Sequence, residues 1–217
     1  MTKHHSRTLG SLAVAMIAAW LGSMALAHDP DSPPARKPDA KTELRLAMRK
    51  LWEEHLTYTR NYIISALAGL PDADAVVQRL MKNQDDIGAA VKTYYGSDAG
   101  TKLATLLRDH IKIAAEVVKA AKSGKKHDLE AEQKKWSENG KEIAAFLSAA
   151  NPKWSKVSLE EMLQKHLDLT SGEVVARLQK DWAADIKAYD AGHEHMLMFS
   201  DMLTDGIAQQ FPDKFAP

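Results

Sequence analysis

The chain has 217 residues, of which 45% are hydrophobic and 27% charged, as is ordinary for a soluble globular protein. Its 29 basic and 29 acidic residues balance, so composition gives no support for nucleic-acid binding or for a polybasic membrane surface. Cysteine is absent from the sequence, which excludes disulfides, a lipidated cysteine and covalently attached c-type haem.

The first 27 residues have the pattern of a secretory signal peptide. Lys3 and Arg7 give a basic start, residues 9–26 are apolar and rich in small side chains, and Ala25-Leu26-Ala27 fits a signal-peptidase site. We therefore predict cleavage after Ala27 and a periplasmic or secreted protein with no stable membrane insertion. An uncleaved anchor is the alternative, because the apolar run approaches the roughly 20 residues that span a bilayer.

The remainder of the chain predicts one helical domain. Residues 28–41 are rich in proline and charge, which is typical of a disordered linker. From residue 42 onward, apolar residues recur at three- and four-residue steps, and no run alternates as a strand would. We expect an all-α antiparallel bundle of about six helices over 42–212, followed by a short tail at 213–217. The expected helices are 42–68, 72–94, one between 98 and 123, 128–149, 158–169 and 173–210.

The last of these is the longest expected helix. Ser158 with Glu161 and Thr170 with Glu173 read as capping boxes, which predicts a short fifth helix and a sixth that starts at Glu173. One apolar stripe is expected to face the core along the sixth helix: Val175, Leu178, Trp182, Ile186, Tyr189, Met196, Leu203 and Ile207.

Each expected helix carries a polar, ligand-type side chain in the middle of its apolar stripe. These exceptions are His55, Asn83, His110, Asn139, His166, Asp185 and His193. A single buried histidine usually serves packing, but such a residue on every helix suggests a site inside the bundle.

The spacing of these residues suggests three helix-hairpin pseudo-repeats. The first arms of the hairpins would contribute His55, His110 and His166. The second arms would contribute a carboxylate just before an isoleucine: Asp86, Glu142 and Asp185. The third pair is irregular, because Asp185 follows its histidine more closely than Asp86 and Glu142 follow theirs.

Imidazoles and carboxylates that point inward from facing helices are typical ligands of iron, copper, zinc or manganese. We therefore predict that the bundle binds a transition metal or a small cofactor, with haem or a small organic ligand as further possibilities. The predicted ligands and their hydrogen-bonding partners are His55, His110, His166, Asp86, Glu142, Asp185, His193 and His195.

The alternative is a non-enzymatic interaction or stress module, in which the buried polar residues only specify how the helices pack. Arg60 fits either function, since it can neutralise a buried carboxylate or bury its stem and expose its charge. E-x-x-H pairs, H-E-x-x-H, G-x-S-x-G, P-loop and G-x-G-x-x-G motifs are all absent from the sequence. No catalytic group is identified, and the sequence favours a protein that is not an enzyme.

Several segments resemble an uncharacterised family of small all-helical bacterial proteins. They are LWEEH at 51–55, TRNYIIS at 59–65, WSENGKEI at 136–143, NPKW at 151–154 and GIAQQFP at 206–212. The resemblance covers nearly all of 44–211, and it implies an all-α domain without an established site. Members are often named glycosyltransferase or acetylglutamate kinase. Those activities imply a βα alternation and a nucleotide loop that this sequence lacks.

Overall fold

A computed structural model describes residues 38–216 of the chain. The predicted signal peptide at 1–27 and the predicted linker up to residue 37 lie outside this part. Within it the chain forms six α-helices and a short 3-10 helix, η1, and no strand, so the predicted all-α bundle is confirmed. The bounds are α1 Ala40–Ala68, α2 Ala73–Tyr95, α3 Ser97–Ser123, α4 Lys126–Ala150, α5 Lys156–Leu178, α6 Trp182–Gln210 and η1 Pro212–Lys214.

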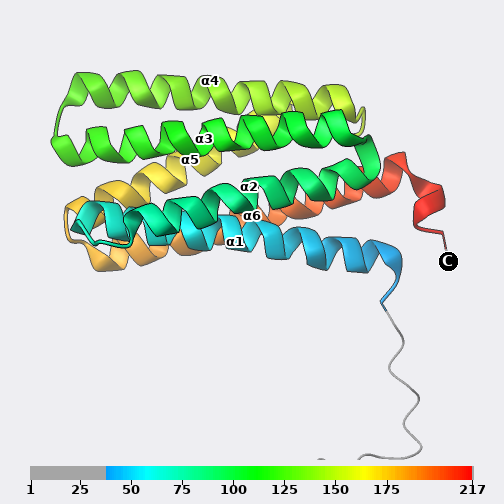
Figure 1. Ribbon diagram of the computed structural model, residues 1–217, viewed down its shortest axis with the longest axis horizontal. Coiled ribbons are helices and arrows are strands. Elements are labelled where there is room, and N and C mark those ends of the chain that lie inside the picture. The colour runs from blue at the N-terminus through cyan, green and yellow to red at the C-terminus, as the bar shows by residue number, and fades with distance from the viewer. Residues whose placement is uncertain (1–37, 217) are drawn as a thin grey trace, which may run out of the picture. The chain divides into compact units, whose positions relative to one another are not determined.

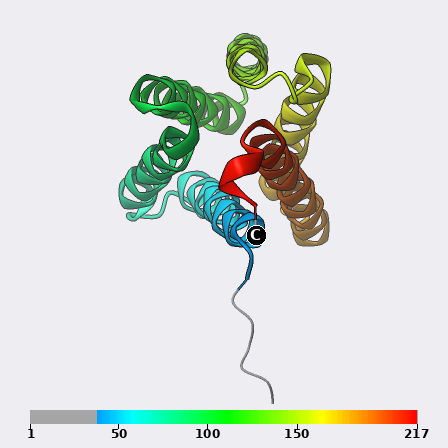
Figure 2. The same cartoon turned by 90° about the vertical axis from the view of Figure 1, so that its right-hand side faces the viewer.

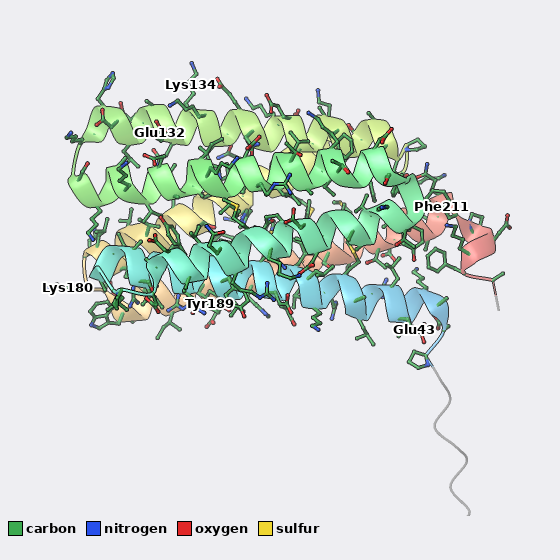
Figure 3. All side chains as sticks on the ribbon, viewed as in Figure 1. Glu43, Glu132, Lys134, Lys180, Tyr189 and Phe211 are labelled. Atoms are coloured by element: carbon green, nitrogen blue, oxygen red, sulfur yellow. The ribbon has the colours of Figure 1, made fainter. Side chains whose placement is uncertain are left out.

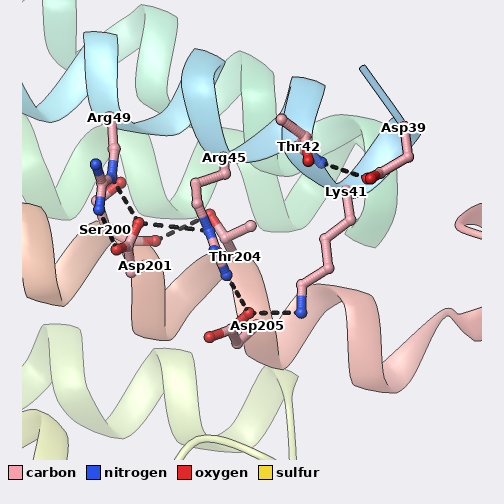
Figure 4. Close-up of polar contacts among 9 residues, drawn as sticks. All are labelled: Asp39, Lys41, Thr42, Arg45, Arg49, Ser200, Asp201, Thr204 and Asp205. Carbon is pink, nitrogen blue, oxygen red and sulfur yellow. Dashed lines mark hydrogen bonds and ion pairs between the residues drawn. The ribbon is translucent and has the colours of Figure 1, made fainter. Parts of the chain in front are cut away.

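Local sequence signals set the ends of α1. At its start, the carboxylate of Asp39 accepts a hydrogen bond of 2.8 Å from the backbone N–H of Thr42, which satisfies one of the unpaired donors of the first turn (Figure 4). At its end, Gly69 adopts a left-handed conformation with φ of 69° and donates its N–H to the carbonyl of Ser65. The chain then turns into α2.

The six helices form three hairpins, α1–α2, α3–α4 and α5–α6, whose turns lie at the same end of the bundle (Figure 1). Viewed end-on, the helices follow one another around a ring, and α6 packs back against α1 (Figure 2). The first arms α1, α3 and α5 also contact one another across the interior. The inward faces of these three arms therefore meet near the axis of the bundle.

The surface of the bundle is strongly charged. Figure 3 shows Lys134 projecting from the outer side of α4. Between α1 and α6, Arg49 pairs with Asp201 through an Nε–Oδ1 hydrogen bond of 2.8 Å, and Arg45 pairs with Asp205 (Figure 4). These exposed or half-exposed pairs are worth less than about 1 kcal/mol each, so their main effect is to fix the register of the two helices.

The division between the last two helices differs from the sequence prediction. α5 is continuous from Lys156 to Leu178, and the chain breaks only at Gln179–Asp181, where Lys180 has a φ of 60°. Thr170 is not a cap, because its hydroxyl donates within α5 to the carbonyl of His166. The caps are Ser155 for α5 and Asp181 for α6, each of which accepts a hydrogen bond from the backbone N–H three residues on.

The break also overturns the first half of the expected apolar stripe. Met196, Leu203 and Ile207 are buried as predicted, but Trp182 and Ile186 are each 53% exposed. Val175 and Leu178, on the last turns of α5, are exposed as well. A stripe can stay in phase only along one unbroken helix. The non-helical residues 179–181 therefore put Val175 and Leu178 out of phase with α6. Trp182 and Ile186 lie on α6 itself, in its first turns at the end of the bundle where the hairpin turns lie (Figure 1).

The C-terminal residues pack on the bundle. The predicted tail contains most of η1, and the ring of Phe215 stacks on Tyr94 with centroids 5.9 Å apart. Over the described residues, no helix combines the length and apolar character needed to cross a membrane.

Candidate functional site

The structure brings the three predicted histidines of the first arms together. His55 from α1, His110 from α3 and His166 from α5 are each only 2–3% exposed. The ring centroid of His166 lies 5.6 Å from that of His55 and 6.0 Å from that of His110. The three predicted histidines therefore lie close to one another inside the bundle.

The imidazole of His110 is held by hydrogen bonds at both nitrogens. The indole Nε1–H of Trp136 donates to its Nε2 at 3.1 Å. Because Nε2 accepts, the ring hydrogen of neutral His110 lies on Nδ1, which donates to Oδ1 of Asn139 at 2.8 Å. The amide nitrogen of Asn139 in turn donates to the carbonyl of Leu106. His110 thus serves packing, with its tautomer fixed by α4.

His55 and His166 are bound less completely. Their Nδ1 atoms are buried without a hydrogen-bonding partner, and the hydroxyl oxygen of Thr59 beside them is also unpaired. Since most buried polar atoms in proteins are paired, three unpaired atoms at one place call for a ligand or a buried water.

These atoms belong to residues that line a small internal cavity. Its volume is about 20 Å³, and its walls come mainly from α1, α3 and α5. The three first arms contribute equivalent positions, spaced by one helical turn. These are the histidines, then Thr59, Ala114 and Thr170, then Ile63, Val118 and Val174. A cavity of this volume holds one water molecule or one ion and is far too small for haem or an organic cofactor.

The three imidazoles are neutral. Burial lowers the pKa of His55 to about 3 and that of His110 to about 4. Burial, together with the neighbouring imidazoles, lowers the pKa of His166 well below its ordinary value. Each ring therefore keeps one unprotonated nitrogen as an acceptor or metal donor at neutral pH.

The structure supports the three-hairpin repeat but corrects its third member. Asn83 and Asn139 donate to the carbonyls of Leu51 and Leu106, each four residues before the histidine of the same hairpin. In the third hairpin, Nε2 of His195 hydrogen-bonds at 2.8 Å to the carbonyl of Met162, four residues before His166. His195 is thus the third counterpart of Asn83 and Asn139. Its sequence separation from His166 equals that of Asn139 from His110. The position three residues after His195, which corresponds to Asp86 and Glu142, is Met198 and not Asp185.

Asp86 and Glu142 do not point inward. Asp86 is half-buried at the surface and pairs with Lys82 at 2.7 Å, one turn earlier on α2. Glu142 is exposed on α4. Both follow a buried asparagine by three positions, which rotates them by about 60° away from the buried direction of the helix.

Asp185 is buried but belongs to an ion-pair cluster rather than to the histidines. It accepts two hydrogen bonds of 3.1 Å from Arg60 and one of 2.8 Å from Arg177. Arg60 also donates to Glu173 at 2.8 Å and stacks over the ring of Tyr189. Arg60 therefore neutralises buried carboxylates, which was one of its two expected roles.

Glu173 is a buried ionisable residue that the sequence pattern did not place in the site, because Thr170 and Glu173 together resemble a helix cap. It lies on α5 beside Val174, which lines the cavity. Burial raises its pKa to about 7, against the opposing effect of Arg60, and the charge of Asp185 raises it further. The carboxyl group of Glu173 therefore changes protonation near neutral pH.

His193 and His195 lie apart from the three central imidazoles. His193 is half-buried, with Nε2 3.8 Å from a carboxylate oxygen of Glu53. His195 bonds to the backbone of α5, as described above. Over residues 38–216, no three histidine, aspartate or glutamate side chains are placed to bind one metal ion together. With His110 fully bonded, the unpaired imidazole nitrogens at the cavity are Nδ1 of His55 and Nδ1 of His166, and the side chain of Gln84, whose oxygen is also unpaired, lies close to His55.

No family model, curated protein or solved structure matches this chain. The family resemblance therefore stays a prediction, and the evidence for function is the geometry of the site itself.

Proposed function

We propose that the mature protein is exported and binds one transition-metal ion, iron, copper, zinc or manganese, in the cavity between His55 and His166. The observation that carries this proposal is the pair of unpaired Nδ1 atoms, on side chains 2–3% exposed, beside a cavity of about 20 Å³. Export rests on the leader sequence at 1–27, and fractionation of cells that produce the full chain tests it.

The separation of the two rings suits a shared ion. Imidazoles that bind one metal through nitrogens at about 2.0–2.1 Å have ring centres roughly 5 to 6.5 Å apart, depending on the angle at the metal. The centroids of His55 and His166 lie 5.6 Å apart. The spacing of the two rings is therefore compatible with one ion bound between them.

His110 is the third imidazole beside the cavity, and its nitrogens are not free to bind a metal. Its ring is 6.0 Å from His166 but is held by Trp136 and Asn139. Turning it toward the cavity breaks two buried hydrogen bonds and leaves their partners unpaired, at about 1–3 kcal/mol for each group. A metal that also bound His110 would have to offset the free energy of these two broken hydrogen bonds. Binding through His55 and His166 alone is therefore favoured.

Metal analysis of untagged protein purified from the periplasm tests the proposal. We expect one equivalent of metal per chain, lost in His55→Gln and in His166→Gln, which remove the imidazole but keep a polar side chain. His127→Gln is the matched control, because His127 is fully exposed in the first turn of α4. Less than a tenth of an equivalent in the unaltered protein after incubation with each metal would refute metal binding.

The alternative function, an interaction module with purely structural polar residues, has its own support. Asn83 and Asn139 bond to backbone carbonyls of the neighbouring helix and thereby specify packing. If all three histidines serve the same purpose, the cavity holds only water. The glutamine variants would then alter stability without any change in metal content.

A further inference from the structure

The charge of the cavity wall limits the kind of ion that it can hold. The wall consists of three neutral imidazoles, hydroxyl-bearing side chains and apolar groups, and none of its residues is a carboxylate. An ion in this cavity therefore receives lone pairs but no compensating negative charge from the side chains that surround it.

The two buried carboxylates of residues 38–216 already form ion pairs with arginine side chains. Asp185 is paired with Arg60 and Arg177, and Glu173 is paired with Arg60. Two carboxylates and two guanidinium groups leave no excess negative charge in this cluster. The helices around the cavity thus offer no counter-charge for a divalent ion.

The cost of placing an ion in a low-dielectric cavity rises with the square of its charge. The desolvation free energy of a divalent ion is therefore about four times that of a monovalent ion of the same size. Zinc, iron and manganese also need four or more ligands, whereas the cavity offers two free imidazole nitrogens.

We propose that the site is selective for a monovalent, nitrogen-binding ion, cuprous copper, held between His55 and His166. This inference rests on the proposed function and narrows it to one class of metal. Cuprous copper accepts two neutral nitrogen donors in a linear or bent arrangement, and the 5.6 Å between the ring centroids suits a bent one. Sodium and potassium instead prefer oxygen. No step of electron transfer is implied, because the ion is bound as it arrives.

The test compares monovalent and divalent ions on the full, untagged protein. Cu⁺ is supplied anaerobically with ascorbate and a colorimetric chelator as competitor, Ag⁺ serves as a redox-inert substitute, and Zn²⁺ is titrated in parallel. We expect one Cu⁺ or Ag⁺ per chain, bound at least about a hundredfold more tightly than Zn²⁺. His127→Gln should behave as the unaltered protein does.

A second variant separates the loss of a ligand from a loss of folding. His166→Met replaces an imidazole by a thioether of similar size, which suits soft monovalent ions and not zinc. We expect it to keep Ag⁺ and Cu⁺ binding within about tenfold, while His166→Gln loses at least about a hundredfold. The melting temperature of each metal-free variant shows that it is folded before titration.

Two results overturn the inference in different ways. If Zn²⁺ binds as tightly as Cu⁺ and depends on His55 and His166, metal binding stands and the monovalent selectivity is wrong. If neither Cu⁺, Ag⁺ nor Zn²⁺ binds to the folded protein, and parallel titrations with Fe²⁺ and Mn²⁺ are also negative, both proposals are wrong.

Discussion

Acidification from pH 7 to pH 5 should destabilise the protein through its three buried histidines. Burial keeps His55, His110 and His166 neutral in the folded state, with pKa values of about 3 for His55, about 4 for His110 and well below the ordinary value for His166. In the unfolded chain each ring titrates near 6.5, so the unfolded state binds more protons below that pH. The stabilising effect of the neutral rings is present above about pH 6.5 and is lost as the pH falls toward the folded pKa values.

The magnitude follows from the same linkage. At pH 5, protonation favours the unfolded state by about 2 kcal/mol for each ring, or about 6 kcal/mol for three. Glu173 acts in the opposite direction, because its pKa is raised to about 7 in the folded protein. Its protonation favours the folded state as the pH falls. Between pH 7 and pH 5 this adds about 2 kcal/mol to the free energy of unfolding. The expected net loss is about 4 kcal/mol, a large share of the 5–15 kcal/mol that is typical of a domain.

Urea denaturation of metal-free protein at pH 7, 6 and 5, followed by circular dichroism, measures this loss. The Glu173→Gln variant sharpens the test, because it removes the opposing protonation while keeping a polar group beside Arg60. Its loss between pH 7 and pH 5 should rise to about 6 kcal/mol. His127→Gln, at an exposed site, should follow the unaltered protein. A free energy of unfolding that is flat or increasing from pH 7 to pH 5 would refute the buried neutral imidazoles.

Three further substitutions test the packing, each by urea denaturation at pH 7. Gly206→Ala should destabilise by at least about 1–3 kcal/mol, because a Cβ there would overlap the indole of Trp154. Asn139→Leu should cost about 1–3 kcal/mol, because it leaves Nδ1–H of His110 buried without an acceptor. Asp201→Asn weakens the half-exposed ion pair of Asp201 with Arg49, between α6 and α1. It should change the free energy of unfolding by less than about 1 kcal/mol.

The fold and the convergence of the histidines could be predicted because α1, α3 and α5 are long and unbroken. Along such helices the 3.6-residue period keeps its phase, so His55, His110 and His166 share the buried face with their apolar neighbours. The hairpin repeat then brings equivalent faces to one axis.

The carboxylates could not be assigned in the same way. Asp86 lies only about 60° from the buried direction of α2, and the nearby Lys82 gives it a partner at the surface. The burial of Asp185 depends on Arg60 and Arg177, which come from other helices, and no local pattern encodes that cluster.

The position of the break between α5 and α6 was also predicted wrongly. Lys180 adopts a left-handed conformation without being a glycine or asparagine, so the residue type gives no warning of the turn. A usable signal was Asp181, whose side chain caps α6 by accepting from the N–H of Ala184. The equal sequence separations from His110 to Asn139 and from His166 to His195 were a second signal, for the correct repeat.

The most direct test of the central claim is an anomalous-difference map from crystals of the full-length protein grown with copper under reducing conditions. The account predicts one peak per chain, inside the bundle between the imidazoles of His55 and His166, with His110 still bonded to Trp136 and Asn139. An interior without a peak, or copper found only at surface histidines such as His127, would contradict it.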